Sequence, residues 1–520
     1  MLDLIKNGNS ALAVPADADE GQIIPEYFAS RLFRLPIARA NLAAALLAGL
    51  ALRLFFVIRF SFFTGDTKFY DALARNWLYH GVYGLFVAGQ LTPTDMRAPG
   101  YPAFLAAVYA LFGPNHRAVL IAQVIVGLLT CLGIAAIAAR LAPTASRKKA
   151  ATAALWIAAL CPFTANYASI LVTEELAMLF TTFALLIFVS LLEHPFIASP
   201  NSASPRSTFS FAGWAAIGGI LVGLGTLVRP ETPLVLAAAG LIFTIRLRRR
   251  IDWPKLTLTI SWMAVGLLLP LLPWASRNAR VLGRIQFLAP HYAETEGDFI
   301  PYGFFNWSKT WMTRPDENYL VPWKLGNAPI PIESLPASAF DSMAERNRVA
   351  TLLTAYNADL KMSPLLDHEF ELLARERTAR HPLRTYLVIP LERVGAMWFT
   401  PPVRALRYSG ALWPPGERWR ENPWDFGITA GFGLLNLVYF GLAVAGAWHC
   451  RARSAMAMLI AFVLIRTALL TQQTSIEPRY VILCFPAFLA IAAQAWTIAR
   501  PSLATSAARS GWAAGQATAD

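Results

Sequence analysis

About ten apolar runs, most of them long enough to cross a lipid bilayer, constrain this chain more than any other feature of its sequence. A helix needs about 20 apolar residues to cross a hydrocarbon core, and within lipid it satisfies its own backbone hydrogen bonds. The runs lie at 40–63, 118–139, 150–165, 174–192, 211–228, 232–245, 256–275, 427–448, 454–472 and 480–498. The sequence therefore predicts an all-α polytopic membrane protein with about ten transmembrane helices.

Composition supports a lipid environment. Hydrophobic residues make up 56% of the chain and charged residues 15%, against about 25% charged residues in ordinary soluble domains. The net charge of +13 would suggest nucleic acid as the partner of a soluble protein, but here the basic residues cluster between apolar runs. We therefore expect the lipid bilayer, and no nucleic acid, as a partner. The four cysteines lie in or beside apolar runs, so no disulfide framework is implied.

The basic clusters also predict the orientation of the helices, because cytoplasmic loops carry the excess of Lys and Arg. With Arg39 inside, the later inside segments hold Arg140 and 147–149, the linker 193–210, the run 246–250, and Arg451 with Arg453. The apolar run 99–113 is only about 15 residues long, so we interpret it as a re-entrant or interfacial segment. We expect a multi-pass protein of the inner (plasma) membrane with any active site on the extracytoplasmic face.

The same pattern predicts five regions. Residues 1–39 lack a basic start followed by an apolar core, so they are expected to form a cytoplasmic tail rather than a cleaved signal peptide. The other regions are a seven-span module at 40–275 with its first outside loop at 64–117, a small mixed extracytoplasmic domain at 276–425, C-terminal transmembrane helices at 426–498, and a cytoplasmic tail at 499–520.

Uncommon polar residues gather in the predicted outside segments. Asp66 begins a stretch in which Phe69, Leu73 and Trp77 recur every four residues, which is typical of an interfacial helix. Asp66 could cap this helix or serve a function, and the spacing leaves both open. Further along the same loop, Asp95 and Arg97 could form a surface ion pair, or they could contact an anionic substrate.

Two acidic residues stand at the outer end of the fourth span. Glu174 and Glu175 follow Thr173, an arrangement that the helix dipole favours. Two carboxylates at a membrane boundary are nevertheless costly to bury. The functional alternative is that one of them faces Asp66 across a cleft.

Arginines occupy two further outside turns and one span. A guanidinium in a turn can bind phosphate oxygens bidentately, or it can extend toward lipid headgroups. An ionisable residue at membrane depth is a functional candidate by default, and Arg466 is such a residue. The two turns carry Arg229 and Glu231 on either side of Pro230, and Glu477, Arg479 and Tyr480.

Together, these carboxylates and arginines could activate an acceptor hydroxyl and hold a phosphate leaving group. His291, Glu294, Glu296 and Asp298 could add ligands for a divalent metal ion. Solvated loops often carry such residues, so no cofactor is certain and metal ligands stay unknown at this point.

Six segments give the chain a family resemblance. In order they are GDTKFYDALARNWL, RAPGYPAFL, LVTEEL, RPE, PWASRN and EPRY. They resemble the GT-C superfamily of membrane glycosyltransferases, most nearly the bacterial branch related to protein O-mannosyltransferases and the lipid A aminoarabinose transferase. The resemblance covers roughly 40–290 and 380–498 and depends on the order and topological placement of the segments.

This resemblance implies an inverting transfer of a sugar from a polyprenyl-phosphate donor to an extracytoplasmic lipid, cell-envelope glycan or protein acceptor. It implies that Asp66 is an essential aspartate and that Glu174, or less favourably Glu175, is the second acid. It implies phosphate and donor contacts from Arg229, Arg479 and Tyr480, and we expect Tyr70, Arg97, Glu175, Glu231 and Arg466 to complete the set of substrate-binding residues. Arg97 stands near the position where the aminoarabinose transferase has an acid, so a shared metal site is not implied.

Two other function classes remain open. A transporter or flippase of lipid-linked saccharides could line its path with the same polar residues, although transporters usually show repeated halves. A non-catalytic assembly factor could bind glycan or protein through aromatic residues of the outside segment, which include Trp307, Trp311, Trp323, Trp413, Trp419 and Trp424.

Overall fold

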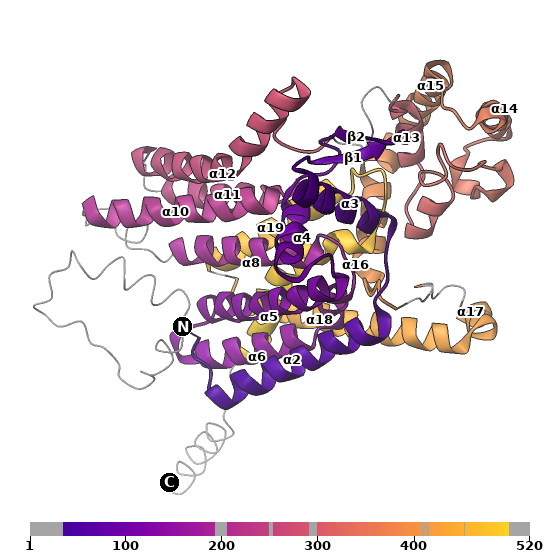
Figure 1. The fold of residues 1–520 in the computed structure, drawn as a ribbon. Coiled ribbons are helices and arrows are strands. Elements are labelled where there is room, and N and C mark those ends of the chain that lie inside the picture. Colours follow the sequence, from indigo (N-terminus) through magenta and orange to yellow (C-terminus); the bar gives the residue numbers. More distant parts are fainter. Residues whose placement is uncertain are drawn as a thin grey trace, which may run out of the picture.

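The computed structural model describes residues 35–192, 205–248, 253–290 and 299–498, apart from residues 407, 409, 411, 413, 414 and 452. Most of these residues form helices that run side by side in one bundle (Figure 1). Seven stretches are long and apolar enough to span a membrane. They are α2 (Arg39–Phe60), α5 (His116–Leu141), α8 (Glu174–Leu191), α10 (Pro205–Thr226), α12 (Trp253–Leu282), α18 (Pro423–His449), and the run η9 (Pro478–Cys484), α20 (Phe485–Ala492) and η10 (Ala493–Thr497).

Three other predicted spans form shorter helices. They are α6 (Arg147–Leu160), α11 (Leu234–Arg248) and α19 (Ser454–Leu470), and each packs against longer helices of the bundle. The all-α polytopic architecture is thus confirmed, whereas the count of ten spans stays a prediction. The run 99–113 forms α4 (Gly100–Phe112), which at 13 residues is too short to cross a bilayer.

Glycines set the close packing of α10 against α12. A Cβ atom on Gly219 would lie 2.4 Å from the carbonyl oxygen of Met263, and one on Gly266 would lie 2.2 Å from that of Ala216. Gly223 approaches the carbonyl oxygen of Leu267 in the same way. Small residues of this kind let two backbones meet closely, which is how helices associate in lipid.

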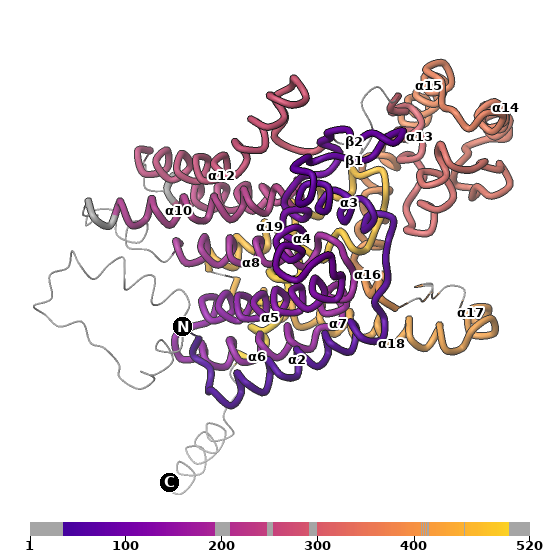
Figure 2. Tube along the Cα trace, viewed as in Figure 1, coloured from indigo at the N-terminus to yellow at the C-terminus, as the bar shows by residue number. Residues whose placement is uncertain are grey.

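The two ends of the bundle differ in chemistry. At one end, Arg246 donates a hydrogen bond to Ser454 Oγ (2.7 Å), and Arg453 donates to the carbonyl of Ala142 (3.0 Å). The first loop lies at the other end of the bundle (Figure 2), where its Asp66 pairs with Arg479 of η9. That loop consists of α3 (Gly65–His80), the antiparallel strands β1 (Gly84–Val87) and β2 (Gln90–Pro93), and α4.

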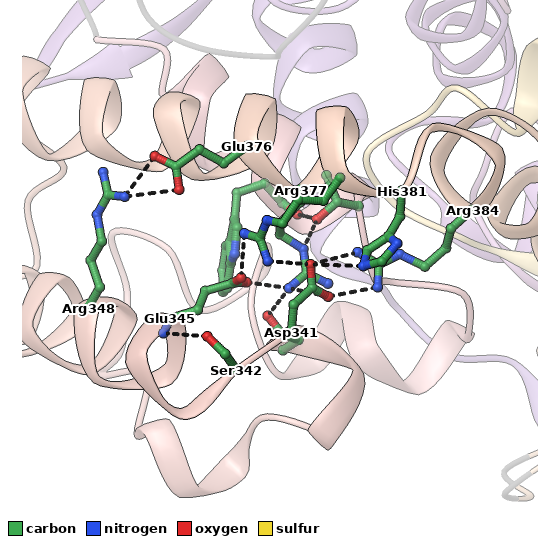
Figure 3. Close-up of polar contacts among 12 residues, drawn as sticks. Asp341, Ser342, Glu345, Arg348, Glu376, Arg377, His381 and Arg384 are labelled. Atoms are coloured by element: carbon green, nitrogen blue, oxygen red, sulfur yellow. Dashed lines mark hydrogen bonds and ion pairs between the residues drawn. The ribbon is translucent and has the colours of Figure 1, made fainter.

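The segment after α12 forms a helical subdomain at the loop-bearing end. It contains α13 (Tyr302–Lys309), η5 (Pro315–Tyr319), η6 (Ile332–Ser334), η7 (Ala337–Ala339), α14 (Met343–Asp359) and α15 (Pro364–Arg380). A buried ion cluster joins η7, α14 and α15 (Figure 3). Arg377, with a fully buried side chain, pairs with Glu345 and with Asp341, and it donates to the carbonyl of Ala339. A buried charge of this kind needs its partners, because breaking such a pair leaves an uncompensated charge.

The chain then returns to the bundle. The π-helical turn η8 (Arg384–Val388) continues into α16 (Ile389–Phe399), which packs against α18, α19 and η9. Trp398 at its end stacks on Phe485, and its Nε1 donates to Thr467 Oγ1 (3.1 Å). A short helix, α17 (Pro415–Glu421), precedes α18. Part of the predicted outside segment is therefore packed directly on the membrane helices.

Candidate active site

A cavity of about 220 Å³ lies at the loop-bearing end of the bundle. Charged and aromatic residues from four separate parts of the chain line it. They are Asp66, Tyr70, Arg97, Glu174, Arg229, Glu231, Arg479 and Tyr480. The structure thus brings eight of the ten predicted site residues to one cavity.

Asp66 is held between two arginines. Its Oδ1 lies 3.3 Å from an NH2 nitrogen of Arg97, and its Oδ2 lies 3.3 Å from NH1 of Arg479. Thr64 is the N-cap of α3, because its hydroxyl accepts the Thr67 amide (3.2 Å) in a capping box. Asp66 is therefore not the cap, and its carboxylate faces the cavity instead. Burial alone would raise the pKa of Asp66, but Arg479 and Arg97 together hold that pKa below its ordinary value.

The loop that presents Arg97 is anchored from two sides. The Tyr83 hydroxyl donates to the carbonyl of Arg97 (2.8 Å), and Arg277 at the end of α12 donates to the carbonyls of Tyr83 (2.7 Å) and Thr94 (2.9 Å). The Arg277 guanidinium also lies over the rings of Tyr83 and Trp274. These contacts hold the backbone around Arg97 in place beside Asp66.

Arg229 is the centre of a second charged group. Its NH2 lies 2.6 Å from Glu174 Oε1, and its NH1 lies 3.4 Å from Glu231 Oε1. Arg466 contacts the same Glu231 oxygen at 3.1 Å. Burial would raise the pKa of Glu231, but Arg229 and Arg466 hold it below its ordinary value. Arg466 therefore lies behind Glu231 and does not line the cavity.

Tyr480 lies between the two groups. The guanidinium carbons of Arg229 and Arg479 stand 5.8 Å and 5.6 Å from the centre of its ring, and its hydroxyl donates to Glu477 (3.1 Å). Glu477 in turn lies 2.6 Å from Arg479 Nε. The charged groups therefore form two rows in which positive and negative side chains alternate, and both rows reach the Tyr480 ring. The first row is Arg97, Asp66, Arg479 and Glu477, and the second is Arg466, Glu231, Arg229 and Glu174.

One arginine of the site was missed in the sequence. Arg404, from the segment between α16 and α17, lies 3.9 Å from Glu477 and extends the first row. No motif distinguishes it from other arginines of the outside segment. Over the two rows, five guanidinium groups face four carboxylates, so one positive charge is in excess. The members are Arg97, Arg229, Arg404, Arg466 and Arg479, with Asp66, Glu174, Glu231 and Glu477.

The two neighbouring acids of α8 point in different directions. Glu174 lines the cavity, whereas Glu175 does not. Glu175 faces the interior of the bundle near Arg53, since a Cβ on Gly127 would lie 2.9 Å from Glu175 Oε2 and 2.7 Å from Arg53 Nε. Tyr70 does line the cavity, with its ring 5.1 Å from that of Tyr101, and burial raises the pKa of Tyr70.

Two other predictions have different outcomes. The ion pair considered between Asp95 and Arg97 is wrong, because Asp95 pairs with Arg284 (2.9 Å) while Arg97 turns to Asp66. The candidate metal ligands His291, Glu294, Glu296 and Asp298 lie outside the described residues. Within the described part of the chain, no group of three or more His, Cys, Asp or Glu side chains is arranged to hold a metal ion.

Comparisons with solved structures give only weak likenesses. The AglB oligosaccharyltransferase from Archaeoglobus fulgidus, in complex with an inhibitory peptide and a dolichol-phosphate, has a TM-score of 0.46 at 14% identity, covering 92% of this chain and 52% of that chain. ArnT from Cupriavidus metallidurans bound to undecaprenyl phosphate has a TM-score of 0.37 at 14% identity, covering 88% and 78%. The chain thus spans about half the length of the oligosaccharyltransferase that it matches.

No curated protein sequence matches the chain. A family model gives a more specific result than the solved structures. Residues 96–274 match the model of the dolichyl-phosphate-mannose-protein mannosyltransferase family. The matched region includes Arg97, Glu174, Arg229 and Glu231, four of the residues that line the cavity. This match confirms the predicted resemblance of the chain to the GT-C superfamily of membrane glycosyltransferases.

Proposed function

We propose that this protein is an inverting glycosyltransferase that moves a sugar from a polyprenyl-phosphate donor to a hydroxyl of an extracytoplasmic lipid, cell-envelope glycan or protein. One observation carries the proposal above all others. Asp66 is held between Arg97 and Arg479 in the same cavity that Arg229 and Glu174 line. A carboxylate and several guanidinium groups around one space are the groups that such a transfer requires.

The charge of the site suits this donor. A sugar joined to a lipid through one phosphate is a phosphodiester with a single negative charge, and the two rows of charges carry one positive charge in excess. When the bond from the sugar to the phosphate breaks, the departing polyprenyl phosphate gains negative charge. Arg229 and Arg479 line the cavity and can stabilise that charge as it develops, which lowers the barrier.

Asp66 is the group proposed to receive the acceptor. The acceptor oxygen forms a bond to the anomeric carbon on the face opposite the phosphate, while the bond from that carbon to the phosphate oxygen breaks. The hydroxyl proton passes to the Asp66 carboxylate and is released to solvent afterwards. A single displacement of this kind inverts the anomeric configuration, and Glu174 helps by holding Arg229 in place (2.6 Å).

Arg97 and Arg479 link donor binding to removal of the proton from the acceptor. In the free protein Arg97 and Arg479 lower the pKa of Asp66, which makes its carboxylate a weak base. The phosphate of a bound donor competes for the same N–H groups. The carboxylate then becomes more basic after the donor has bound, so proton removal from the acceptor is coupled to donor loading.

The proposed side of the membrane follows from the charges of the bundle ends. Arg140, Arg246 and Arg453 lie at the end opposite the cavity, and basic residues mark the cytoplasmic side. We therefore place the cavity on the extracytoplasmic face of the plasma membrane.

The test is transfer of a labelled sugar from polyprenyl phosphate to acceptors extracted from the cell envelope, with purified protein in lipid. We expect Asp66→Asn to lower the rate by about 10²- to 10⁴-fold, the usual contribution of a positioned base, while the variant remains folded. The control is Asp71→Asn on the same helix, whose carboxylate binds His116 (2.9 Å) and Tyr109 (2.6 Å) away from the cavity. This variant should keep most of its activity.

Two results would overturn the proposal. Undiminished transfer by Asp66→Asn would exclude Asp66 from the chemistry. Movement of labelled donor across the bilayer without a new glycosidic bond would identify a flippase instead.

A further inference from the structure

The segment between α16 and α17 is clamped onto the bundle by one buried asparagine. Asn166, in η3 (Asn166–Ser169), is fully buried. Its Oδ1 accepts the backbone amides of Arg404 (3.0 Å) and Ala405 (3.3 Å), and its Nδ2 donates to the carbonyl of Pro402 (3.3 Å). Both ends of the amide group are thus used to hold a stretch of chain that comes from the outside segment.

This clamp places the Arg404 side chain beside Glu477. The Arg404 NH1 lies 3.9 Å from Glu477 Oε2, the same oxygen that lies 2.6 Å from Arg479 Nε. The Arg404 NH1 atom is buried and donates no hydrogen bond to any described residue. A buried guanidinium nitrogen without a hydrogen bond is costly, so a charge partner is needed to keep it there, and Glu477 is that partner.

Glu477 also determines where Arg479 points. It accepts two contacts from Arg479, at 2.6 Å and 2.9 Å, which leaves NH1 of Arg479 directed at Asp66 (3.3 Å). Arg404 and Arg479 share the negative charge of Glu477, because both contact its Oε2 atom. Without Arg404, the two rows would hold equal numbers of opposite charges, and Glu477 would retain Arg479 more strongly against an incoming phosphate.

We infer that Arg404 is a positioning residue for the donor phosphate, acting through Glu477 on Arg479. This inference rests on the proposed function and deepens it, because it gives the outside segment a part in donor binding. Asn166 links the outside segment to donor binding, because it holds the backbone of Arg404 in place.

The first experiment measures donor binding and turnover in Arg404→Gln. We expect the KM for the donor and the Kd for undecaprenyl phosphate to rise by about tenfold, the size of an ordinary coupling between neighbouring charges, with little change in kcat. Arg404→Lys keeps the charge and should recover most of the affinity. A change that merely damaged the fold would lower kcat as well and would not be rescued by lysine.

The matched control is Arg375→Gln. Arg375 stands on α15 in the same outside segment, its side chain is 73% exposed, and it pairs with Glu371 on the surface. Its loss should leave both the KM and the Kd unchanged.

A double-mutant cycle tests the route through Glu477. If Arg404 acts through that carboxylate, Arg404→Gln should have little further effect in a Glu477→Gln background. Additive effects, or an unchanged Kd in Arg404→Gln, would overturn the inference. Failure of the inference about Arg404 can be distinguished from failure of the proposed function. A wild-type protein that binds undecaprenyl phosphate but transfers no sugar would refute the proposed function alone.

Discussion

At the scale of single residues, the site depends on which partner each charge finds. Asp66 could have capped α3, but Thr64 takes that position and leaves the carboxylate to Arg97 and Arg479. Asp95 could have paired with its near neighbour Arg97, but it pairs with Arg284. These choices are made by side chains from distant parts of the chain, so local sequence could only provide the candidates.

The pairing of Asp66 predicts a pH dependence. The pKa of Asp66 lies below its ordinary value of 3.8, so the carboxylate form proposed as the base is present above the lowered pKa and is lost as pH falls through it. Arg97→Gln removes one of the two main causes of the lowering, while burial still raises the pKa. The acid limb of the kcat/KM profile, which reports the free enzyme, should therefore move to higher pH than in the wild type.

The measurement is kcat/KM for the donor between about pH 3 and pH 8 in both proteins. The control is Arg117→Gln at the start of α5, which has no contact with Asp66 and should leave the limb in place. If the acid limb of the kcat/KM profile in Arg97→Gln lies at the wild-type pH or at a lower pH, the assignment of this limb to Asp66 is wrong.

At the scale of elements, helix packing decides whether the site residues meet. Arg229 follows α10, and Arg277 stands near the end of α12, so the close contact of these two helices brings both arginines to the loop-bearing end. The alternating apolar and basic segments predicted the helices. The glycine contacts that set the spacing between α10 and α12 appear only in the structure.

Enlarging one of these glycines should separate the two helices. In Gly219→Leu the new side chain begins 2.4 Å from the carbonyl oxygen of Met263, so α10 and α12 must move apart. Overpacking of this kind usually costs about 1–3 kcal/mol. We expect a lower midpoint of thermal unfolding for the protein in detergent, together with reduced transfer activity.

Gly213→Leu is the matched control on the same helix. Gly213 is exposed on the bundle surface, and no atom lies within 4 Å of a Cβ built there. This variant should unfold near the wild-type temperature. Equal losses in the two variants would show that a general effect of the larger side chain, rather than the α10–α12 contact, causes the destabilisation.

At the scale of the whole molecule, the bundle separates a basic end from a cavity-bearing end. This separation predicts opposite accessibility of two exposed positions in intact cells. Gln90→Cys in β2 should react with a membrane-impermeant maleimide, whereas Ala145→Cys in the 3-10 turn η2 (Thr144–Ser146) should react only after permeabilisation. The native cysteines Cys131, Cys161, Cys450 and Cys484 are all buried, so background labelling should be low. The reverse pattern would place the cavity on the cytoplasmic side.

The helical membrane architecture and a set of polar candidates follow from the linear order of residues, because apolar length and the placement of basic clusters are properties read along the chain. The sequence motifs also carry a resemblance to the GT-C superfamily, which the family model supports over residues 96–274. Packing in three dimensions is what makes Glu174 line the cavity while Glu175 faces the bundle interior, and what brings Arg404 beside Glu477. The rotation of a helix about its axis, and the neighbours that a returning segment meets, are set by packing between distant parts of the chain.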